Sequence, residues 1–155
     1  MPMDTKRVHD DLREFLRLLN EAKVEYLIVG GYAVGHHGYV RPTQDMDVWV
    51  ATHPANARKI IKILNGFIGM APDESLLTQP SQVFRIGRTP VRLELFTSVK
   101  GVEFDSCYKR RSIGDMDGVP ANFLCLADLR VSKKAAARLK DLADLDELPE
   151  TEQTT

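Results

Sequence analysis

The sequence predicts one α+β domain, a mixed sheet of four to five strands flanked by helices. Short β-rich runs alternate with stretches of helical periodicity along the whole chain. Of the 155 residues, 43% are apolar and 28% charged, which fits one core with a well-solvated surface. We expect a single domain over residues 1–148 and a flexible tail over 149–155, because the length leaves little room for a second full domain.

The first predicted element is an amphipathic helix that follows an N-cap at Asp4 or Thr5 and ends near Asn20. A β-rich run at residues 25–29 then stops at Gly30-Gly31, and residues 32–37 form a short helix. The apolar residues of the first helix recur at helical spacing: Val8, Leu12, Phe15, Leu16 and Leu19.

The second strand is expected at residues 45–50, and Pro54 opens the next helix. Gly, Pro and polar residues in the stretch 66–80 predict a loop, with one helical turn at 74–77. The remaining expected elements are strands 82–86 and 91–96 around an 87–90 turn, a helix at 104–111, a turn at Asp117-Gly118, and one or two helices over 126–148.

Composition excludes several classes of protein. Lys plus Arg number 21 and Asp plus Glu 22, so no overall basic field indicates a long nucleic-acid partner. Cys107 and Cys125 lack the spacing of a zinc site and are expected to be reduced, structural thiols. The charged N-terminal stretch and the lack of a long apolar run predict a cytoplasmic protein without a membrane partner.

Three carboxylates are candidate metal ligands. Asp45 and Asp47 project to the same side of their strand, and Met46 points the other way into the core. Two such groups repel unless a cation lies between them, and hard oxygen ligands suit Mg²⁺ (or Mn²⁺). Glu94, the one acid within strand 91–96, is the candidate third ligand. By itself an acid-x-acid pattern is more often the solvated face of an edge strand.

The Gly30-Gly31 turn is a candidate phosphate site. A strand that ends in two glycines and leads into a helix lets backbone N–H groups approach an anion closely. An isolated Gly-Gly is more often a tight turn that needs glycine for its backbone angles. The acids that follow at short spacing favour the phosphate site.

Residues 26–38, with their Gly30-Gly31 turn, and residues 41–47, which end in Asp-Met-Asp, resemble the signature of the DNA polymerase beta-like nucleotidyltransferase superfamily. The closest likeness is to small AbiEii-type or minimal nucleotidyltransferases, some of them toxin–antitoxin components. It implies the nucleotidyltransferase fold, with Asp45, Asp47 and Glu94 as catalytic metal ligands. Glu94 stands where relatives usually have Asp, and Gly31 where many have Ser.

The same resemblance assigns nucleotide-binding roles outside the glycine turn. Residues 129–144 are similar to the helical Lys-to-Lys-Asp motif of this branch, which implies that Lys133 and Lys140 face the triphosphate. On one continuous helix these lysines, seven residues apart, share a face, and a solvated, salt-bridged helix is the alternative explanation. Arg41 and Thr43 match the Arg-x-Thr lead into the acid pair, where they orient the acids or touch the nucleotide.

The implied activity is metal-dependent transfer of a nucleoside monophosphate from a triphosphate such as ATP to a hydroxyl acceptor, with release of pyrophosphate. A protein side chain, as in toxin–antitoxin pairs, is the favoured acceptor because the near-neutral charge argues against a long RNA; an RNA 3′ end stays open. Alternatives are a catalytically inactive nucleotide-binding or antitoxin-like module and a purely structural domain. Retention of the three acids and Lys133 argues against the inactive module, and the occurrence of four matched elements in the right order argues against the structural domain.

Overall fold

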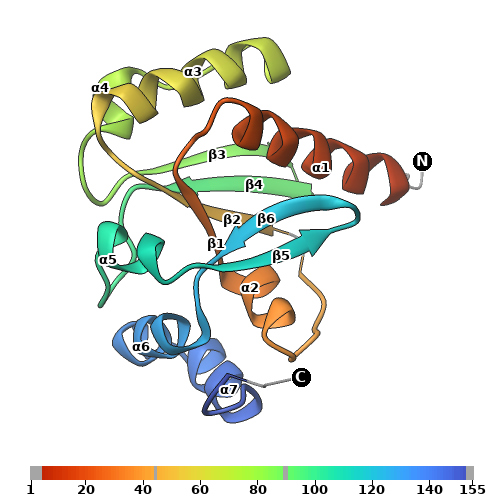
Figure 1. The fold of residues 1–155 in the computed structure, drawn as a ribbon, viewed down its shortest axis with the longest axis vertical. Coiled ribbons are helices and arrows are strands. Elements are labelled where there is room, and N and C mark those ends of the chain that lie inside the picture. The colour runs from red at the N-terminus through yellow and green to blue at the C-terminus, as the bar shows by residue number, and fades with distance from the viewer. Residues whose placement is uncertain (1–4, 44, 89–90, 153–155) are drawn as a thin grey trace.

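The computed structural model describes residues 5–43, 45–88 and 91–152 and contains a six-stranded mixed sheet with helices on both faces (Figure 1). The strand order across the sheet is β3-β4-β2-β1-β6-β5. The strands are β1 (Tyr26–Val29), β2 (Asp45–Val50), β3 (Val83–Arg88), β4 (Val91–Phe96), β5 (Ser112–Met116) and β6 (Val119–Phe123). The predicted α+β class and mixed sheet are confirmed.

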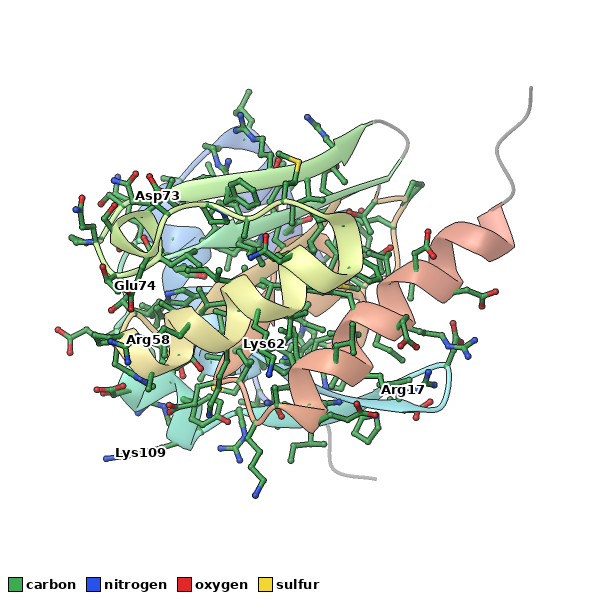
Figure 2. All side chains as sticks on the ribbon, turned by 90° about the horizontal axis from the view of Figure 1, so that it is seen from above. Arg17, Arg58, Lys62, Asp73, Glu74 and Lys109 are labelled. Carbon is green, nitrogen blue, oxygen red and sulfur yellow. The ribbon has the colours of Figure 1, made fainter. Side chains whose placement is uncertain are left out.

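Helices α1 (Thr5–Glu21) and α3 (Pro54–Ile68) lie side by side across one face of the sheet, as Figures 1 and 2 both show. Pro54 is in the first turn of α3, where its missing N–H costs nothing, and Gly69 ends the helix at φ 76°. The inward stripes of both helices are fully buried against the sheet, together with Met46 of β2: Phe15, Leu16, Leu19, Ala57, Ile60 and Leu64.

The opposite face carries α2 (Gly30–His36), α6 (Leu126–Ala136) and α7 (Leu139–Glu147), which lie below the sheet in Figure 1. The short helix α4 (Glu74–Leu77) packs against α3, and α5 (Phe104–Lys109) follows β4. No helix in the described part of the chain is long and apolar enough to cross a bilayer.

Strand register decides which side chains meet on the face below the sheet. β2 runs antiparallel to β1 and parallel to β4. Asp47 is therefore opposite Val29 on one side and Glu94 on the other, and Asp45 is opposite Arg92. Residues opposite one another in a ladder point to the same face, so Asp45, Asp47 and Glu94 share one face of the sheet.

Two strands were not among the elements expected from the sequence, and the sheet therefore has six strands rather than four or five. β5 and β6 form an antiparallel hairpin around the predicted Asp117-Gly118 turn. Glycine in β5 and Pro120 in β6 weaken the local strand pattern. The hairpin is stabilised by its place in the sheet, where Val119, Ala121 and Phe123 of β6 are buried.

Other boundaries differ by a few residues. Helix α2 begins at Gly30 rather than at residue 32, and α3 continues to Ile68. The expected helical segment 126–148 is two helices. Parts of three predictions lie outside the described residues: the N-cap at Asp4, positions 89–90 of the hairpin turn and positions 153–155 of the tail.

Candidate active site

The Gly30-Gly31 turn sits directly against the acid-bearing strand. Gly30 has φ 69°, and a Cβ at this position would lie 2.3 Å from Oδ2 of Asp47. A Cβ on Gly31 would lie 2.6 Å from Oγ1 of Thr43. Close contacts therefore require glycine at both positions, and at Gly30 the left-handed backbone conformation requires it as well. The contact with Thr43 also explains why a serine is absent from the second position: its side chain would displace Thr43.

Asp47 lies at the centre of the site and is poorly satisfied by its protein surroundings. Its Oδ1 is buried and has no hydrogen-bond partner among the described residues. Burial is the largest cause that raises the pKa of Asp47 to about 7, and the charges of Glu94 and Asp45 raise it further. Lys140 and Lys133 act in the opposite direction. A positive charge beside Asp47 would therefore be strongly favourable.

The other two acids are paired with arginines. Arg92 donates from Nε and Nη2 to the two oxygens of Asp45 at 3.2 and 3.3 Å. Arg85 donates from Nε to Oε1 of Glu94 at 3.1 Å. Within the residues that the structure describes, no three His, Cys, Asp or Glu side chains converge closely enough to hold a metal in this arrangement.

The donor set nevertheless fits a hard divalent cation. The available ligands are carboxylate oxygens, which Mg²⁺ and Mn²⁺ prefer, and the unpartnered Oδ1 of Asp47 is the position where a ligand is needed. Asp45 and Glu94 flank Asp47 on the same face and would exchange their arginine partners for the cation. These three residues would hold the metal.

Lys133 is the centre of a buried ion-pair network below the acids. It is 5% exposed, and its Nζ lies 3.3 Å from Asp141 Oδ1 and 2.9 Å from Asp144 Oδ2. Arg41 donates two hydrogen bonds to Asp144 at 2.8 and 2.9 Å, and Arg138 donates to Asp141 at 2.7 Å. The network joins α6, α7 and the loop that leads into β2.

Burial in this network would raise the pKa of Asp141 and of Asp144, but hydrogen bonds from arginine and the charge of Lys133 outweigh it. The net result is a lowered pKa for both carboxyl groups. Both aspartates are therefore ionised at neutral pH, and Lys133 has two fixed anionic partners. This fixes the position of its ammonium group beside the cavity described next.

The predicted shared face of Lys133 and Lys140 is wrong. Ala137 adopts φ 51° and ends α6, so the two lysines lie on different helices. Lys133 is buried in α6, whereas Lys140 is exposed near the start of α7. The positive charges of both lysines nevertheless act to lower the pKa of Asp47.

A cavity of about 200 Å³ opens between the sheet and α6 and is lined by both turn and network residues. Val29 and Phe96 of the sheet and Leu129 of α6 supply apolar walls. Gly30, Asp47, Lys133 and Arg138 line its polar part. The charged side chains in the lining are two acids, Asp47 and Asp141, and three cations, Lys100, Lys133 and Arg138. Their position beside an apolar surface suits a ligand with both a phosphate group and an aromatic ring.

Thr43 and Arg41, expected near the nucleotide, support the site through other contacts. Thr43 donates from Oγ1 to the backbone carbonyl of Asp45 at 3.3 Å and packs on Gly31. Arg41 binds α7 through Asp144. The partners of the acids, Arg85 and Arg92, were missed in the sequence. Arg92 shares the strand parity of Glu94, but only the pairing of β3 with β4 shows that Arg85 lies beside the same carboxylate.

No family model matches the sequence, and no curated protein matches it. Several solved structures match its fold, among them two nucleotidyltransferase-like proteins. A proposed nucleotidyltransferase from Thermotoga maritima aligns with a TM-score of 0.64 at 15% identity, over 94% of each chain. An antigenic nucleotidyltransferase-like protein from Paracoccidioides brasiliensis aligns with a TM-score of 0.57 at 15% identity, over 94% of this chain and 77% of the other. The likeness establishes that this chain has a nucleotidyltransferase-like fold.

Proposed function

We propose that this protein is a metal-dependent nucleotidyltransferase, which moves a nucleoside monophosphate from a nucleoside triphosphate to a hydroxyl acceptor. The observation that carries the proposal is Asp47: a half-buried carboxylate whose Oδ1 is buried without a hydrogen-bond partner among the described residues, beside a glycine turn and in the lining of a cavity that also contains Lys133. A structural aspartate in such a place would be expected to have a hydrogen-bond partner. A cation and a triphosphate together would satisfy it.

Different residues in and beside the cavity bind the phosphates and the nucleoside of the triphosphate. The backbone amides of the Gly30-Gly31 turn and the charges of Lys133 and Arg138 bind the phosphates. Val29, Phe96 and Leu129 offer apolar surface for the nucleoside. Asp141 and Asp144 hold Lys133 in position, which limits the reorganisation that phosphate binding needs.

The reaction requires little covalent chemistry from the protein. When bound to Asp45, Asp47 and Glu94, Mg²⁺ or Mn²⁺ neutralises phosphate charge and lowers the pKa of the acceptor hydroxyl. The acceptor oxygen attacks the α-phosphorus in line, the bond from this phosphorus to the bridging oxygen of the β-phosphate breaks, and pyrophosphate leaves. A role within a toxin–antitoxin pair, implied by the sequence resemblance, is an extension of this proposal.

A calorimetric titration separates binding from turnover. Each of the four ribonucleoside triphosphates is titrated into wild type and into Asp47→Asn, with and without Mg²⁺. Asp117→Asn, in an exposed turn, is the matched control for loss of one carboxylate. We expect metal-dependent binding that Asp47→Asn weakens at least about tenfold, which corresponds to 1.4 kcal/mol. Absence of metal-dependent binding in wild type would overturn the proposal.

A second candidate function is a nucleotide-binding or antitoxin-like module without turnover. It is favoured by the arginine pairs of Asp45 and Glu94, which neutralise two of the three acids without a metal. Incubation with α-³²P-labelled triphosphates, Mg²⁺ and total cell lysate distinguishes the two functions. Transfer of label that is lost in Asp47→Asn supports the enzyme; binding without transfer to any acceptor supports the module.

A further inference from the structure

Three side chains of strand β4 lie in a row on one face of the sheet. Arg92, Glu94 and Phe96 alternate with buried leucines and therefore point to the same side of the sheet. Successive members of this set are about 6.5 Å apart along the strand. Phe96 lines the cavity, Glu94 is the candidate metal ligand, and Arg92 lies beyond it. The cavity and the arginine are therefore on opposite sides of the acid.

A second arginine, Arg85 on the edge strand β3, lies near Arg92. It is opposite Glu94 in the ladder and diagonal to Arg92, at a Cβ separation of about 7–8 Å for such neighbours. The residue opposite Arg92 is Gly87, which contributes no side chain to cover it. We call Arg85 and Arg92 the arginine pair.

Exposure rises across the site toward the arginine pair. The side chains of Lys133 and Asp141 are 6% and 2% exposed, whereas those of Arg92 and Arg85 are 36% and 66% exposed. Glu94 between them is 11% exposed. The arginine pair is therefore accessible to a large acceptor, whereas on the network side Lys133 and Asp141 are covered and only Arg138, 68% exposed, reaches the surface among these three.

We infer that the arginine pair is an acceptor subsite, and that it binds the terminal phosphodiester of a single-stranded polynucleotide whose 3′-hydroxyl is the attacking group. The inference rests on the proposed function. In-line displacement needs the attacking oxygen and the leaving pyrophosphate on opposite sides of the α-phosphorus. With the triphosphate in the cavity, the acceptor arrives beside Arg85 and Arg92.

The residues that would hold the cation are also the ones that now occupy the arginine pair. Asp45 and Glu94 are the present partners of Arg92 and Arg85. If these carboxylates held a metal, the two guanidinium groups would lose their present partners and become free to bind another anion, and a phosphodiester would match their fork geometry. The exchange would couple acceptor binding to metal binding without movement of the backbone.

A polynucleotide fits this subsite better than a peptide. In a nucleic acid, a phosphodiester always precedes the terminal sugar, so a negative charge stands at a nearly constant distance from the 3′-hydroxyl whatever the sequence. A Ser or Tyr in a peptide has no such fixed anion. The net charge of −1 disfavours a long electrostatic interface, but two local arginines are sufficient for contact with the end of a strand.

The transfer balances without a further reactant. The 3′-oxygen forms a bond to the α-phosphorus of the triphosphate, the bond between that phosphorus and the bridging oxygen breaks, and pyrophosphate departs. The hydroxyl proton is released to solvent water. The acceptor becomes one nucleotide longer, and no oxidant or reductant is consumed.

Fluorescence anisotropy with a short labelled RNA that ends in a free 3′-hydroxyl tests the subsite, in Mg²⁺ and from about 50 to 200 mM salt. The test variant is Arg85→Gln/Arg92→Gln. We expect affinity to fall about tenfold for each arginine, because a charge-assisted contact is lost. The slope of log affinity against log salt should become shallower by about 1.4, which is two contacts at about 0.7 each for a single strand.

Arg58→Gln is the matched control. Arg58 lies on α3, on the opposite face of the sheet, where it is 68% exposed and paired with Glu74 (Figure 2). Arg85→Lys/Arg92→Lys retains both charges and should keep most of the salt slope while it loses bidentate geometry. Equal losses for Arg58→Gln and the glutamine pair would overturn the inference, as would an unchanged salt slope.

Calorimetry on the same proteins separates this inference from the proposed function. The Arg85→Gln/Arg92→Gln variant should bind Mg²⁺ and triphosphate at least as tightly as wild type, because removal of the arginines frees two carboxylates. Weaker binding of either ligand would mean that the substitutions damage the acids, and it would overturn the separate subsite. If wild type binds triphosphate but transfers label only to lysate protein, equally with and without the arginine pair, the acceptor assignment fails and the proposed function stands. If wild type binds no triphosphate, the proposed function itself fails.

Discussion

At the scale of single residues, the site depends on contacts that leave no room for substitution. Gly30 combines a left-handed backbone with a close approach to Asp47. Asp47 in turn has one carboxylate oxygen without a protein partner. The glycine and the aspartate therefore form one unit: the absence of a side chain at position 30 is what gives Asp47 its place at the edge of the cavity.

Gly30→Ala should destabilise the protein by about 1–3 kcal/mol, because a non-glycine residue would be held at φ 69° with its Cβ in contact with Asp47. It should also abolish metal-dependent triphosphate binding. Gly66→Ala in α3 is the control: no atom lies within 4 Å of the added Cβ, and a gain of about 0.5–1 kcal/mol is expected. Urea denaturation measures both. Equal effects would contradict the role given to Gly30.

The raised pKa of Asp47 predicts the sign of a pH dependence. The pKa of Asp47 in the folded protein, about 7, exceeds its ordinary value of 3.8, so between these values the folded protein binds more protons than the unfolded chain. The contribution of Asp47 to stability is full below pH 3.8 and is lost as pH rises through about 7. The metal-free wild type should therefore lose stability relative to Asp47→Asn across this window.

Thermal unfolding of both proteins in EDTA, from pH 4 to pH 8, measures this difference. The difference between the two proteins removes the contributions of other titratable groups. One of these groups is His36: burial lowers its pKa, so its contribution to stability increases as pH rises, opposite to that of Asp47. Saturating Mg²⁺ should remove most of the wild-type loss, since a cation favours the ionised carboxylate. A wild type and variant that respond identically to pH would contradict the burial of an unpartnered carboxylate at position 47.

At the scale of elements, α6 and α7 are held to the sheet side of the molecule by the buried network of Lys133. Its charges come from the consecutive helices α6 and α7, with the residue between them, and from Arg41, about one hundred positions earlier in the chain; each carboxylate has at least two cationic partners. A buried pair contributes little when complete, but removal of one partner leaves an uncompensated buried charge. The network therefore specifies how α7 docks more than it adds stability.

Asp144→Asn should destabilise the fold by about 3–5 kcal/mol, because it deprives both Lys133 and Arg41 of an anionic partner. Asp146→Asn, two residues further along α7 on an exposed position, should change stability by less than about 0.5 kcal/mol. Urea titrations at pH 7 give both values. Similar values for the two variants would show that the network does not hold α7.

At the scale of the whole molecule, the site lies where four separate parts of the chain meet: the β1–α2 turn, strands β2 and β4, and the helices α6 and α7. Ligands that bind across several elements stabilise the complete fold, because the site does not exist in the unfolded chain. Binding of a ligand in this cavity should therefore increase the global stability of the protein.

A triphosphate at about one hundred times its Kd, measured in saturating Mg²⁺, should add about 2.7 kcal/mol to the stability of the Mg²⁺-bound protein and raise its Tm by roughly 5–10 °C in a protein of this size. Differential scanning fluorimetry measures the shift. Triphosphate without metal should give a much smaller shift, and Asp47→Asn should show little response. A full shift in EDTA would contradict metal-dependent binding.

Much of this protein is determined by local sequence. The 3.6-residue repeat of α1, the proline start and glycine end of α3, and the alternation that directs Met46 inward and Asp45 and Asp47 outward are written in short stretches of chain. The acid pair and its glycine turn could be identified for the same reason, because each lies within a few consecutive residues. The mixed α+β architecture followed from the order of these elements.

Only the tertiary structure decided the rest, because long-range pairing has no local signal. Pairing of β3 with β4 placed Arg85 beside Glu94, and the break at Ala137 placed Lys133 and Lys140 on different helices. The β5–β6 hairpin forms because side chains of β6 are buried in the sheet, although its glycine and proline weaken the local strand pattern. Sequence determined which chemical groups are available, and the register of distant strands decided which of them face one another across the site.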